Sequence, residues 1–306
     1  MSGRTGVEIR PATPSTHKNM SNVALASTGE DPVDALMRSV RIPPRPSLLI
    51  DLQQELALDQ PSPRKIAHII GNDVGMSGAL LKLANSPFYG AARKAKSVEQ
   101  GINFLGVNQC SALITGLLAR RALASDGAAL NEFWDLSAKR AQALVFTARR
   151  LRIAPPDIAH TFGLFCDIGV PLLMARFPDY GDTYASASAA PDQPFTAIED
   201  ARHNTNHAAI GCLLARNWGL SADVSWAILL HHDYSVLQDD ATADAVRSLV
   251  ALSVLADKAI QRYHGNSASL EWDKGGQLAK QHLGLDDNEC DELLEELHDM
   301  FGSDHL

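Results

Sequence analysis

Aromatic residues are scarce in this chain of 306 residues. Phe, Trp and Tyr together make up 6% of it, whereas 45% of the residues are hydrophobic, mostly Leu, Ala, Ile and Val. Leu and Ala favour helices, while β-sheets are enriched in aromatic residues. No stretch alternates between apolar and polar residues for long enough to predict a strand. We therefore expect an all-α fold, and the length allows one large domain or two modest ones.

Cysteine and long apolar runs are also scarce. The four cysteines form no CxxC pair, which argues against a disulfide framework and a zinc knuckle; they are Cys110, Cys166, Cys212 and Cys290. No apolar run reaches the length needed to span a bilayer, and residues 1–30 lack the apolar segment of a signal peptide. We expect a cytoplasmic protein with reduced thiols and no membrane association.

The common nucleotide-binding and hydrolase motifs are missing. The sequence contains no P-loop, GxGxxG, GxSxG or HExxH segment, which gives no support to the enzyme classes built on them. The net charge is −9, and this acidity argues against direct nucleic-acid binding. The charge is divided unevenly: residues 1–152 hold 19 Lys and Arg against 12 Asp and Glu, and residues 153–306 hold 8 against 24.

Helical patterns fill most of the chain after a polar segment. Residues 1–30 are rich in Ser, Thr, Pro and Asn, which predicts a flexible tail. Residues 31–125 predict an N-terminal helical part, 131–263 a second helical part, and 264–306 an acidic helical C-terminal extension whose residues 287–301 form an amphipathic helix. The segment 125–131 predicts a linker between the first two parts.

Local signals set several helix ends. Asp31 with Pro32, and Ser62 with Pro63, are N-cap and first-turn pairs, and Gly71 ends the helix that Ser62 begins. A further helix is predicted to carry Met76, Leu80, Leu81 and Leu83 and to end near Asn85. Others are predicted over 97–106, 108–123, 132–151, 155–169, 196–220, 221–232 and 243–263. Residues 178–195 are expected to be looser, with a turn or two of helix in the Ala-rich middle.

The order of several segments resembles the HDOD family. The segments are "IPPRPSLLIDL", "DVGMSGALLKLANSPFYG", "SVEQGINFLGVNQC", "EFWDLSAKRAQALV", "GLFCDIG" and "NHAAIGCLLARNWGLSADVSWAILLHH", over about residues 41–235. The resemblance implies a helical fold related to the HD phosphohydrolases, with an additional N-terminal helical part. It also implies a bacterial regulatory or signalling module that is typically not a hydrolase, with no cofactor.

HD enzymes bind one or two divalent metals through His and Asp side chains, and the resemblance assigns those positions here. Leu136 stands at the first His and Cys166 at the His of the His-Asp pair, while Asp167 keeps the acidic half. His207, His231 and His232 match the later histidines, and Asp257 matches the last Asp. Leu cannot bind a metal, and each lost ligand weakens the site. We expect no native metal; if one binds, its ligands are Asp167, His207, His231 and Asp257.

Structural roles explain the same residues without a metal. Asp167 could cap the helix that follows it. His231 and His232 lie at a helix C-terminus, where the macrodipole would favour their protonated forms. Cys166 could be an unusual zinc ligand, but its apolar neighbours favour an inert buried thiol. His160 and His203 lie one or two helical turns before Asp167 and His207, and packed or solvated histidines are the more common case at such positions.

Two basic stretches are candidate contact surfaces. The first contains Arg93, Lys94 and Lys96 and could meet a phosphate or an acidic partner. The second is a helix carrying Lys139, Arg140, Arg149, Arg150 and Arg152. For both, a solvated face is the more common structure.

Three functions remain open. The first is a non-catalytic regulatory module that binds a protein partner or a nucleotide signal. The second is a residual metal-dependent phosphohydrolase or phosphodiesterase using Asp167, His207, His231 and Asp257. The third is a receptor that binds a cyclic dinucleotide through Arg and His side chains without cleaving it. The sequence identifies neither the partner nor the pathway, because a fold by itself does not name one.

Overall fold

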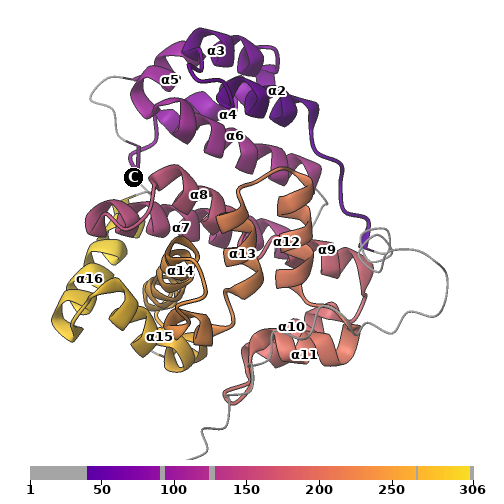
Figure 1. The fold of residues 1–306 in the computed structure, drawn as a ribbon, viewed down its shortest axis with the longest axis vertical. Helices are drawn as coiled ribbons and strands as arrows, with labels where there is room; N and C mark the ends of the chain where they lie inside the picture. Colours follow the sequence, from indigo (N-terminus) through magenta and orange to yellow (C-terminus); the bar gives the residue numbers. More distant parts are fainter. Residues whose placement is uncertain (1–39, 90–93, 124–127, 267, 304–306) are drawn as a thin grey trace, which may run out of the picture.

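A computed structural model describes residues 40–89, 94–123, 128–266 and 268–303. All regular secondary structure in these residues is helical, and none of them lies in a strand, so the predicted all-α fold is confirmed. Figure 1 shows one helical group above a second, with two further pairs of helices below. The helix predicted to begin at Asp31 falls almost wholly outside the described residues, as does the predicted tail.

The upper group is built from short helices whose caps can be read in the sequence. Ser62 accepts a hydrogen bond from the Lys65 amide, as its N-cap position predicts, and Asp73 caps the next helix through the Met76 amide. Capping satisfies amides that the first turn leaves without a partner. The helices are α2 Ser47–Leu56, α3 Pro63–Gly71, α4 Val74–Ala84, α5 Val98–Leu105 and α6 Val107–Ala122.

The second group contains the longest helices. Its central pair is α7 and α8, which pack closely because Gly163 has no side chain: a Cβ there would lie 2.6 Å from Ala141 Cα. The helices are α7 Ala128–Leu151, α8 Pro156–Phe165, α9 Gly169–Arg176, α12 His207–Asn217, α13 Ala222–Leu230 and α14 Asp244–Tyr263, with a short 3-10 helix η1 Tyr234–Gln238.

Four predictions of element bounds need correction. The predicted helix over 196–220 is two helices, α11 Phe195–His203 and α12, because Asn204 takes a left-handed conformation that ends the first. Residues 178–195 contain a regular helix, α10 Tyr180–Ser188. The second half of the predicted linker, from residue 128, is already helical. The helix predicted over 155–169 ends at Phe165, and the chain turns before α9 begins.

The C-terminal segment is part of the main body. It is helical, as predicted, and forms α15 Leu270–Leu283, for which no bounds were predicted, and α16 Asp287–Ser303, which was predicted over 287–301. Both pack against α14, and α16 also contacts α7. Leu293, Leu297 and Phe301 of α16 are buried in the core, so the acidic side chains of this helix lie on its outer face.

Two motifs that carry the family resemblance join the upper and lower groups. Trp218, fully buried after α12, donates from its indole N–H to the Pro43 carbonyl at 3.0 Å. Gln53 of α2 donates to the Trp218 carbonyl at 2.9 Å and accepts from Arg45 at 3.0 Å. The "IPPRPS" and "WGL" segments therefore serve as the two sides of one contact.

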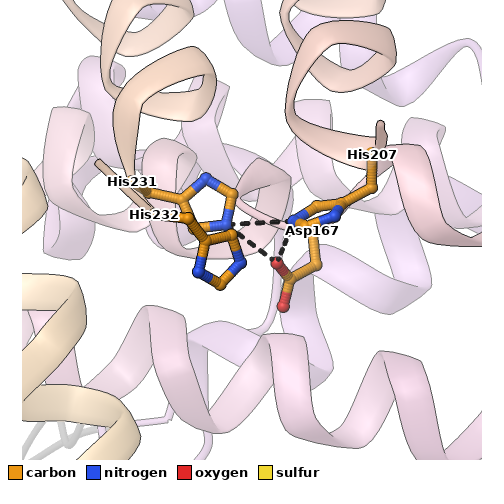
Figure 2. Close-up of side chains that lie close together, drawn as sticks. All are labelled: Asp167, His207, His231 and His232. Atoms are coloured by element: carbon orange, nitrogen blue, oxygen red, sulfur yellow. Dashed lines mark hydrogen bonds and ion pairs between the residues drawn. The ribbon is translucent and has the colours of Figure 1, made fainter. Parts of the chain in front are cut away.

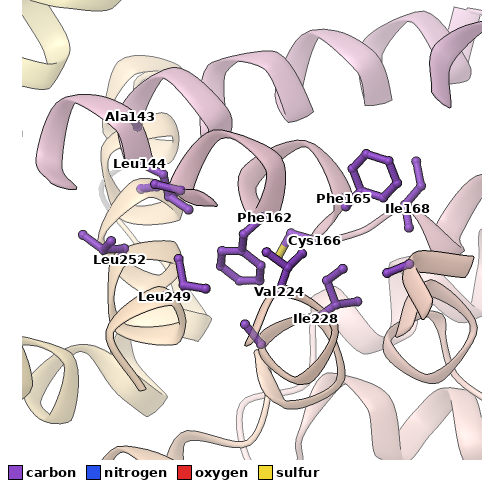
Figure 3. Close-up of a cluster of buried hydrophobic side chains, with 14 of the residues drawn as sticks. Ala143, Leu144, Phe162, Phe165, Cys166, Ile168, Val224, Ile228, Leu249 and Leu252 are labelled. Carbon is purple, nitrogen blue, oxygen red and sulfur yellow. The ribbon is translucent and has the colours of Figure 1, made fainter. Parts of the chain in front are cut away.

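The core beneath the site is apolar and continuous. Figure 3 shows Phe162, Cys166, Val224 and Leu249 packed together from α8, the turn after it, α13 and α14. The prediction that no apolar run is long enough to span a bilayer needs correction: Pro156–Arg176 has the length and hydropathy of a membrane span, but 72% of its apolar window is buried within the protein. Its apolar character is accounted for by this core position.

Candidate functional site

Three helix ends bring the polar cluster together. Asp167 lies in the turn between α8 and α9, His207 begins α12, and His231 and His232 follow the end of α13. The turn can approach α12 only because residue 169 is glycine: a Cβ there would overlap the His207 carbonyl oxygen. The glycine that ends the "CDIG" segment is thus what places Asp167 beside His207.

The cluster is tight and buried. One ligand atom from each of Asp167, His207, His231 and His232 lies within 4.8 Å of the others. Figure 2 shows the two imidazoles of His207 and His231 converging on Asp167. The Asp167 Oδ1 atom lies 3.2 Å from His231 Nε2 and 3.4 Å from His207 Nε2, and the two Nε2 atoms are 3.2 Å apart.

Outer partners fix the orientation of both imidazoles. His207 Nδ1 contacts the Glu199 carboxylate at 2.7 Å, and His231 Nδ1 contacts the Ile228 carbonyl at 2.7 Å. These partners can only accept, so each Nδ1 carries the hydrogen and each Nε2 presents its lone pair in the neutral ring. Two facing lone pairs repel, so the Nε2 atoms need a proton or a cation between them.

The pKa shifts follow from this arrangement. Burial disfavours the charged form of His207, but the Glu199 and Asp167 carboxylates outweigh it and raise its pKa to about 9. Burial likewise opposes the charge on His231, yet its contacts with Cys166 and Asp167 raise its pKa to about 10. For His232, burial and then the charge of His231 lower the pKa to about 3. The carboxylates thus favour a proton on the coupled His207–His231 pair, whereas His232 favours its neutral form.

Arg140 supplies a cation that the sequence patterns did not place here. Its Nη1 atom lies 2.7 Å from Asp167 Oδ2, and its Nε atom lies 2.8 Å from Asp257 Oδ1. Its side chain is 12% exposed, so the prediction of a solvated face is wrong for this residue. The sequence spacing did indicate this position, because Arg140 follows Leu136 by four residues and so lies on the same face of the helix.

The cluster fits one divalent metal ion but not two. Asp167 Oδ1 and the Nε2 atoms of His207 and His231 form a mixed oxygen and nitrogen donor set, and each histidine has the outer partner typical of metal ligands. A second ion would need Asp167 Oδ2 and Asp257, which already bind Arg140. Leu136 offers no ligand and packs against the core.

Other predicted residues lie outside the cluster. Cys166 is buried against the apolar core and contacts His231 of the cluster; burial outweighs this contact and raises the pKa of its thiol. His160 is buried on α8, and His203 stacks on Phe177 and contacts Thr183 at 2.8 Å. Asp257 reaches the cluster only through Arg140.

The predicted basic patch is partly described. Lys94 and Lys96 are exposed, whereas Arg93 lies outside the described residues. Asn85 holds this stretch through two hydrogen bonds with the Ala95 backbone, at 2.7 and 2.9 Å. The asparagine in "ANSPFYG" is therefore an anchor for the basic stretch.

Side chains from α11 and α15, which carry none of the sequence motifs, complete the surroundings of the Asp–His cluster. Phe195 of α11 stacks on His232, with ring centroids 4.9 Å apart and planes 11° apart. Glu199 of the same helix is fully buried and also accepts a hydrogen bond from Tyr180. From α15, Glu271 contacts His232 Nδ1 at 2.9 Å. Helices far apart in the sequence supply these groups, so no local spacing could reveal them.

Comparison with known families agrees with this architecture. The family model for the HDOD domain matches residues 42–234. The chain belongs to the HDOD family. The match ends at Tyr234, so α14, α15 and α16 lie beyond the HDOD segment although they pack on it.

Solved structures share the fold at low sequence identity. A protein from Shewanella amazonensis, provisionally named a phosphohydrolase, is 20% identical with a TM-score of 0.68, covering 88% of this chain and 94% of its own. An HDOD protein of unknown function from Geobacter sulfurreducens is 19% identical with a TM-score of 0.67, covering 89% and 96%. A protein from Marinobacter aquaeolei, provisionally named for signal transduction, is 19% identical with a TM-score of 0.59, covering 89% and 61%. These likenesses show the fold alone.

A curated relative is an uncharacterised protein of Treponema pallidum, 25% identical over 197 residues. The matched region covers 63% of this chain but 38% of the relative. This HDOD chain therefore spans well under half the length of that relative.

Proposed function

We propose that this HDOD chain is a non-catalytic regulatory module that acts by binding a protein partner. The observation that supports this most directly is the Arg140 guanidinium between Asp167 and Asp257. A fixed cation there neutralises the carboxylates that would otherwise bind a second metal. A guanidinium has no coordination position for a water molecule, so it cannot lower the pKa of a bound water as a metal does.

The test is metal analysis of the purified chain together with turnover of a simple aryl phosphodiester. We expect at most one divalent ion per chain and no hydrolysis above the buffer rate with Mn²⁺, Mg²⁺ or Zn²⁺. Two bound ions per chain, together with turnover that Asp167→Ala abolishes, would overturn the proposal.

A residual metal-dependent phosphohydrolase is the second candidate, favoured by the convergence of Asp167, His207 and His231. In that case these three side chains would hold one ion, which when bound lowers the pKa of a water molecule. Glu199 would orient His207, and Phe195 over His232 would limit access of bulk water. Stoichiometric metal with turnover at one ion per chain would favour this candidate over the first.

The partner is proposed to contact the exposed basic stretch that includes Lys94 and Lys96. Affinity purification from the native host with wild type and with Lys94→Glu/Lys96→Glu tests this contact. Lys82→Glu, an exposed lysine on α4, is the matched control. A partner retained equally by all three proteins would remove the basic stretch from the proposal.

A further inference from the structure

A cavity of about 250 Å³, widely open to solvent, lies where the upper helical group meets the lower one. Its walls come from α2, α6, α8 and the start of α13, helices that neighbour each other in Figure 1. It is separate from the Asp–His cluster. Both α8 and α13 begin at the cavity and end at the cluster, and ten residues of helix, such as Ser221 to His231, span about 15 Å.

Part of the polar lining is already used within the protein. The Thr115 hydroxyl donates to the Ser111 carbonyl at 2.8 Å, and the Thr161 hydroxyl donates to the Asp157 carbonyl at 2.8 Å. The Gln53 side chain is held by its contacts with Arg45 and the Trp218 carbonyl.

Three lining side chains have no partner among the described residues. They are the exposed Asn108 amide and the Ser111 hydroxyl, from the first two turns of α6, and the Asp157 carboxylate, from the first turn of α8. Asp157 and Ser111 are partly buried, and the wall also contains apolar side chains such as Ala112, Ile158 and Val224. Polar groups free to bond beside an apolar wall are the usual composition of a small-molecule site.

The lining chemistry selects the class of ligand. Asp157 is the one charged side chain among the lining residues. A carboxylate of this kind only accepts hydrogen bonds when ionised, so Asp157 disfavours an anionic ligand. A cation is disfavoured by the helix N-termini of α6, α8 and α13, which carry positive partial charge. An uncharged ligand with adjacent O–H donors satisfies both conditions, since two such donors can reach the two oxygens of one carboxylate.

We propose that this cavity binds an uncharged small molecule through a vicinal diol. In this assignment the Asp157 carboxylate accepts from two neighbouring hydroxyls, and Asn108 and Ser111 bond the remaining oxygens. The volume lies below the range of about 300–1,000 Å³ usual for ligand sites, which suits a monosaccharide or the ribose of a nucleoside. Binding here goes beyond the proposed function, since it does not depend on whether the Asp–His cluster is catalytic.

The test is saturation-transfer NMR on the full chain, followed by titration, in two arms. The sugar arm uses methyl β-D-ribofuranoside and D-glucose, with methyl 2-deoxy-β-D-ribofuranoside, whose locked furanose ring has no vicinal diol, as control; the nucleoside arm uses adenosine and guanosine with 2′-deoxyadenosine. We expect transfer to the diols of one arm or both, and binding at least about tenfold weaker for the deoxy control of a binding arm, because a hydrogen bond to a charged group is lost. The arm that binds identifies the source of the diol.

Variants distinguish a loss of binding at the cavity from a general loss of the fold. Asp157→Asn keeps the shape of the side chain and should weaken binding by about tenfold or more. Asp223→Asn is the matched control, because Asp223 holds the same second position in the first turn of α13 but does not line the cavity. It should bind like wild type. Ser111→Leu, which fills the cavity from α6, should also abolish binding and serves if Asp157→Asn fails to fold.

Three results would contradict the proposal that the cavity binds a diol. No transfer to any of the four diols would overturn the proposal. So would a deoxy control that binds as tightly as its parent, or affinity unchanged in folded Asp157→Asn or Ser111→Leu. None of these results depends on metal content or turnover, so failure here is distinguishable from failure of the proposed function.

Discussion

Arg140 decides the charge balance of the cluster. Asp257 and Asp167 belong to α14 and to the turn after α8, and the guanidinium from α7 reaches both with hydrogen-bonding geometry. Burial opposes ionisation of Asp167, but Arg140 and the two imidazoles hold the pKa of its carboxyl well below the usual range. At the scale of single residues, the lower helical group is thus held together by a buried charge network.

Replacing Arg140 by Ala should both destabilise the chain and increase its affinity for metal. Removing one partner of a buried ion pair costs about 3–5 kcal/mol, and we expect the lower value because the Asp257 side chain is 29% exposed. Thermal unfolding measures the loss. Added Mn²⁺ should raise the Tm of the variant more than that of wild type, because two carboxylates are freed. Arg149→Ala, exposed on the same helix, is the control and should change neither quantity.

His160 should make stability fall as the pH falls. Burial lowers its pKa from 6.5 to about 4 in the folded chain, and its Nδ1 atom has no hydrogen-bond partner among the described residues. Between these pH values the unfolded state binds the proton and the folded state does not. The stabilising contribution is therefore complete above pH 6.5 and is lost towards pH 4, at up to about 1.4 kcal/mol per pH unit.

Denaturant unfolding at several pH values checks this prediction. His160→Leu should show a shallower loss of stability than wild type between pH 6.5 and 4, by about one proton. His264→Gln, at an exposed position, should follow the wild-type curve. Parallel curves for wild type and His160→Leu would contradict the prediction.

At the scale of elements, close helix contacts place the site. The turn between α8 and α9 approaches the start of α12, and α8 lies tightly along α7, in both cases at a glycine. Interiors are packed too densely to absorb an added methyl group without movement. A single added Cβ can therefore change the distance between α9 and α12.

Gly169→Ala should disrupt the cluster as well as the packing. The new Cβ would overlap the His207 carbonyl, so α12 must move, at a cost of about 1–3 kcal/mol or more. The readouts are Tm and the NMR signals of the histidine imidazoles, which should shift together. Gly181→Ala on α10 is the control: nothing lies within 4 Å of its added Cβ, and Ala in a helix is favoured over Gly by about 0.5–1 kcal/mol. Unchanged imidazole signals in Gly169→Ala would refute this account of the turn.

At the scale of the whole molecule, the part beyond the HDOD match completes the core. α15 and α16 cover α14, and Glu271 of α15 contacts His232 in the cluster. Each large apolar side chain buried fully contributes about 1.5–3 kcal/mol. Leu293, Leu294, Leu297 and Phe301 together therefore contribute an amount comparable to the total stability of a domain.

A chain that ends at residue 263 should consequently fail to fold. We expect it to be insoluble, or to give no cooperative thermal transition and rapid proteolysis, whereas the full chain gives one transition. Circular dichroism and limited trypsin digestion distinguish these outcomes. A truncated chain that unfolds cooperatively near the wild-type Tm would show that α15 and α16 are an accessory layer.

Local rules in the sequence were sufficient for most helices, and the resemblance to the HDOD family indicated the histidine cluster. Ser62 and Pro63 start α3 as predicted, because a cap and a first-turn proline act within a few residues. The motif order placed Asp167, His207, His231 and His232 in one site, and the structure brings them together. The break at Asn204 was missed because the pattern on either side stays helical while one backbone conformation ends the first helix.

The sequence by itself determined the helical fold class, which depends on residue identity and short-range periodicity, and the order of its motifs indicated the family. Only the tertiary structure decided that Arg140 lies between Asp167 and Asp257, that Glu199 and Glu271 support the imidazoles, and that α15 and α16 complete the core. The physical reason is that charge pairing and close packing depend on distances across the chain, up to 117 residues apart for Arg140 and Asp257, and no local pattern encodes those distances.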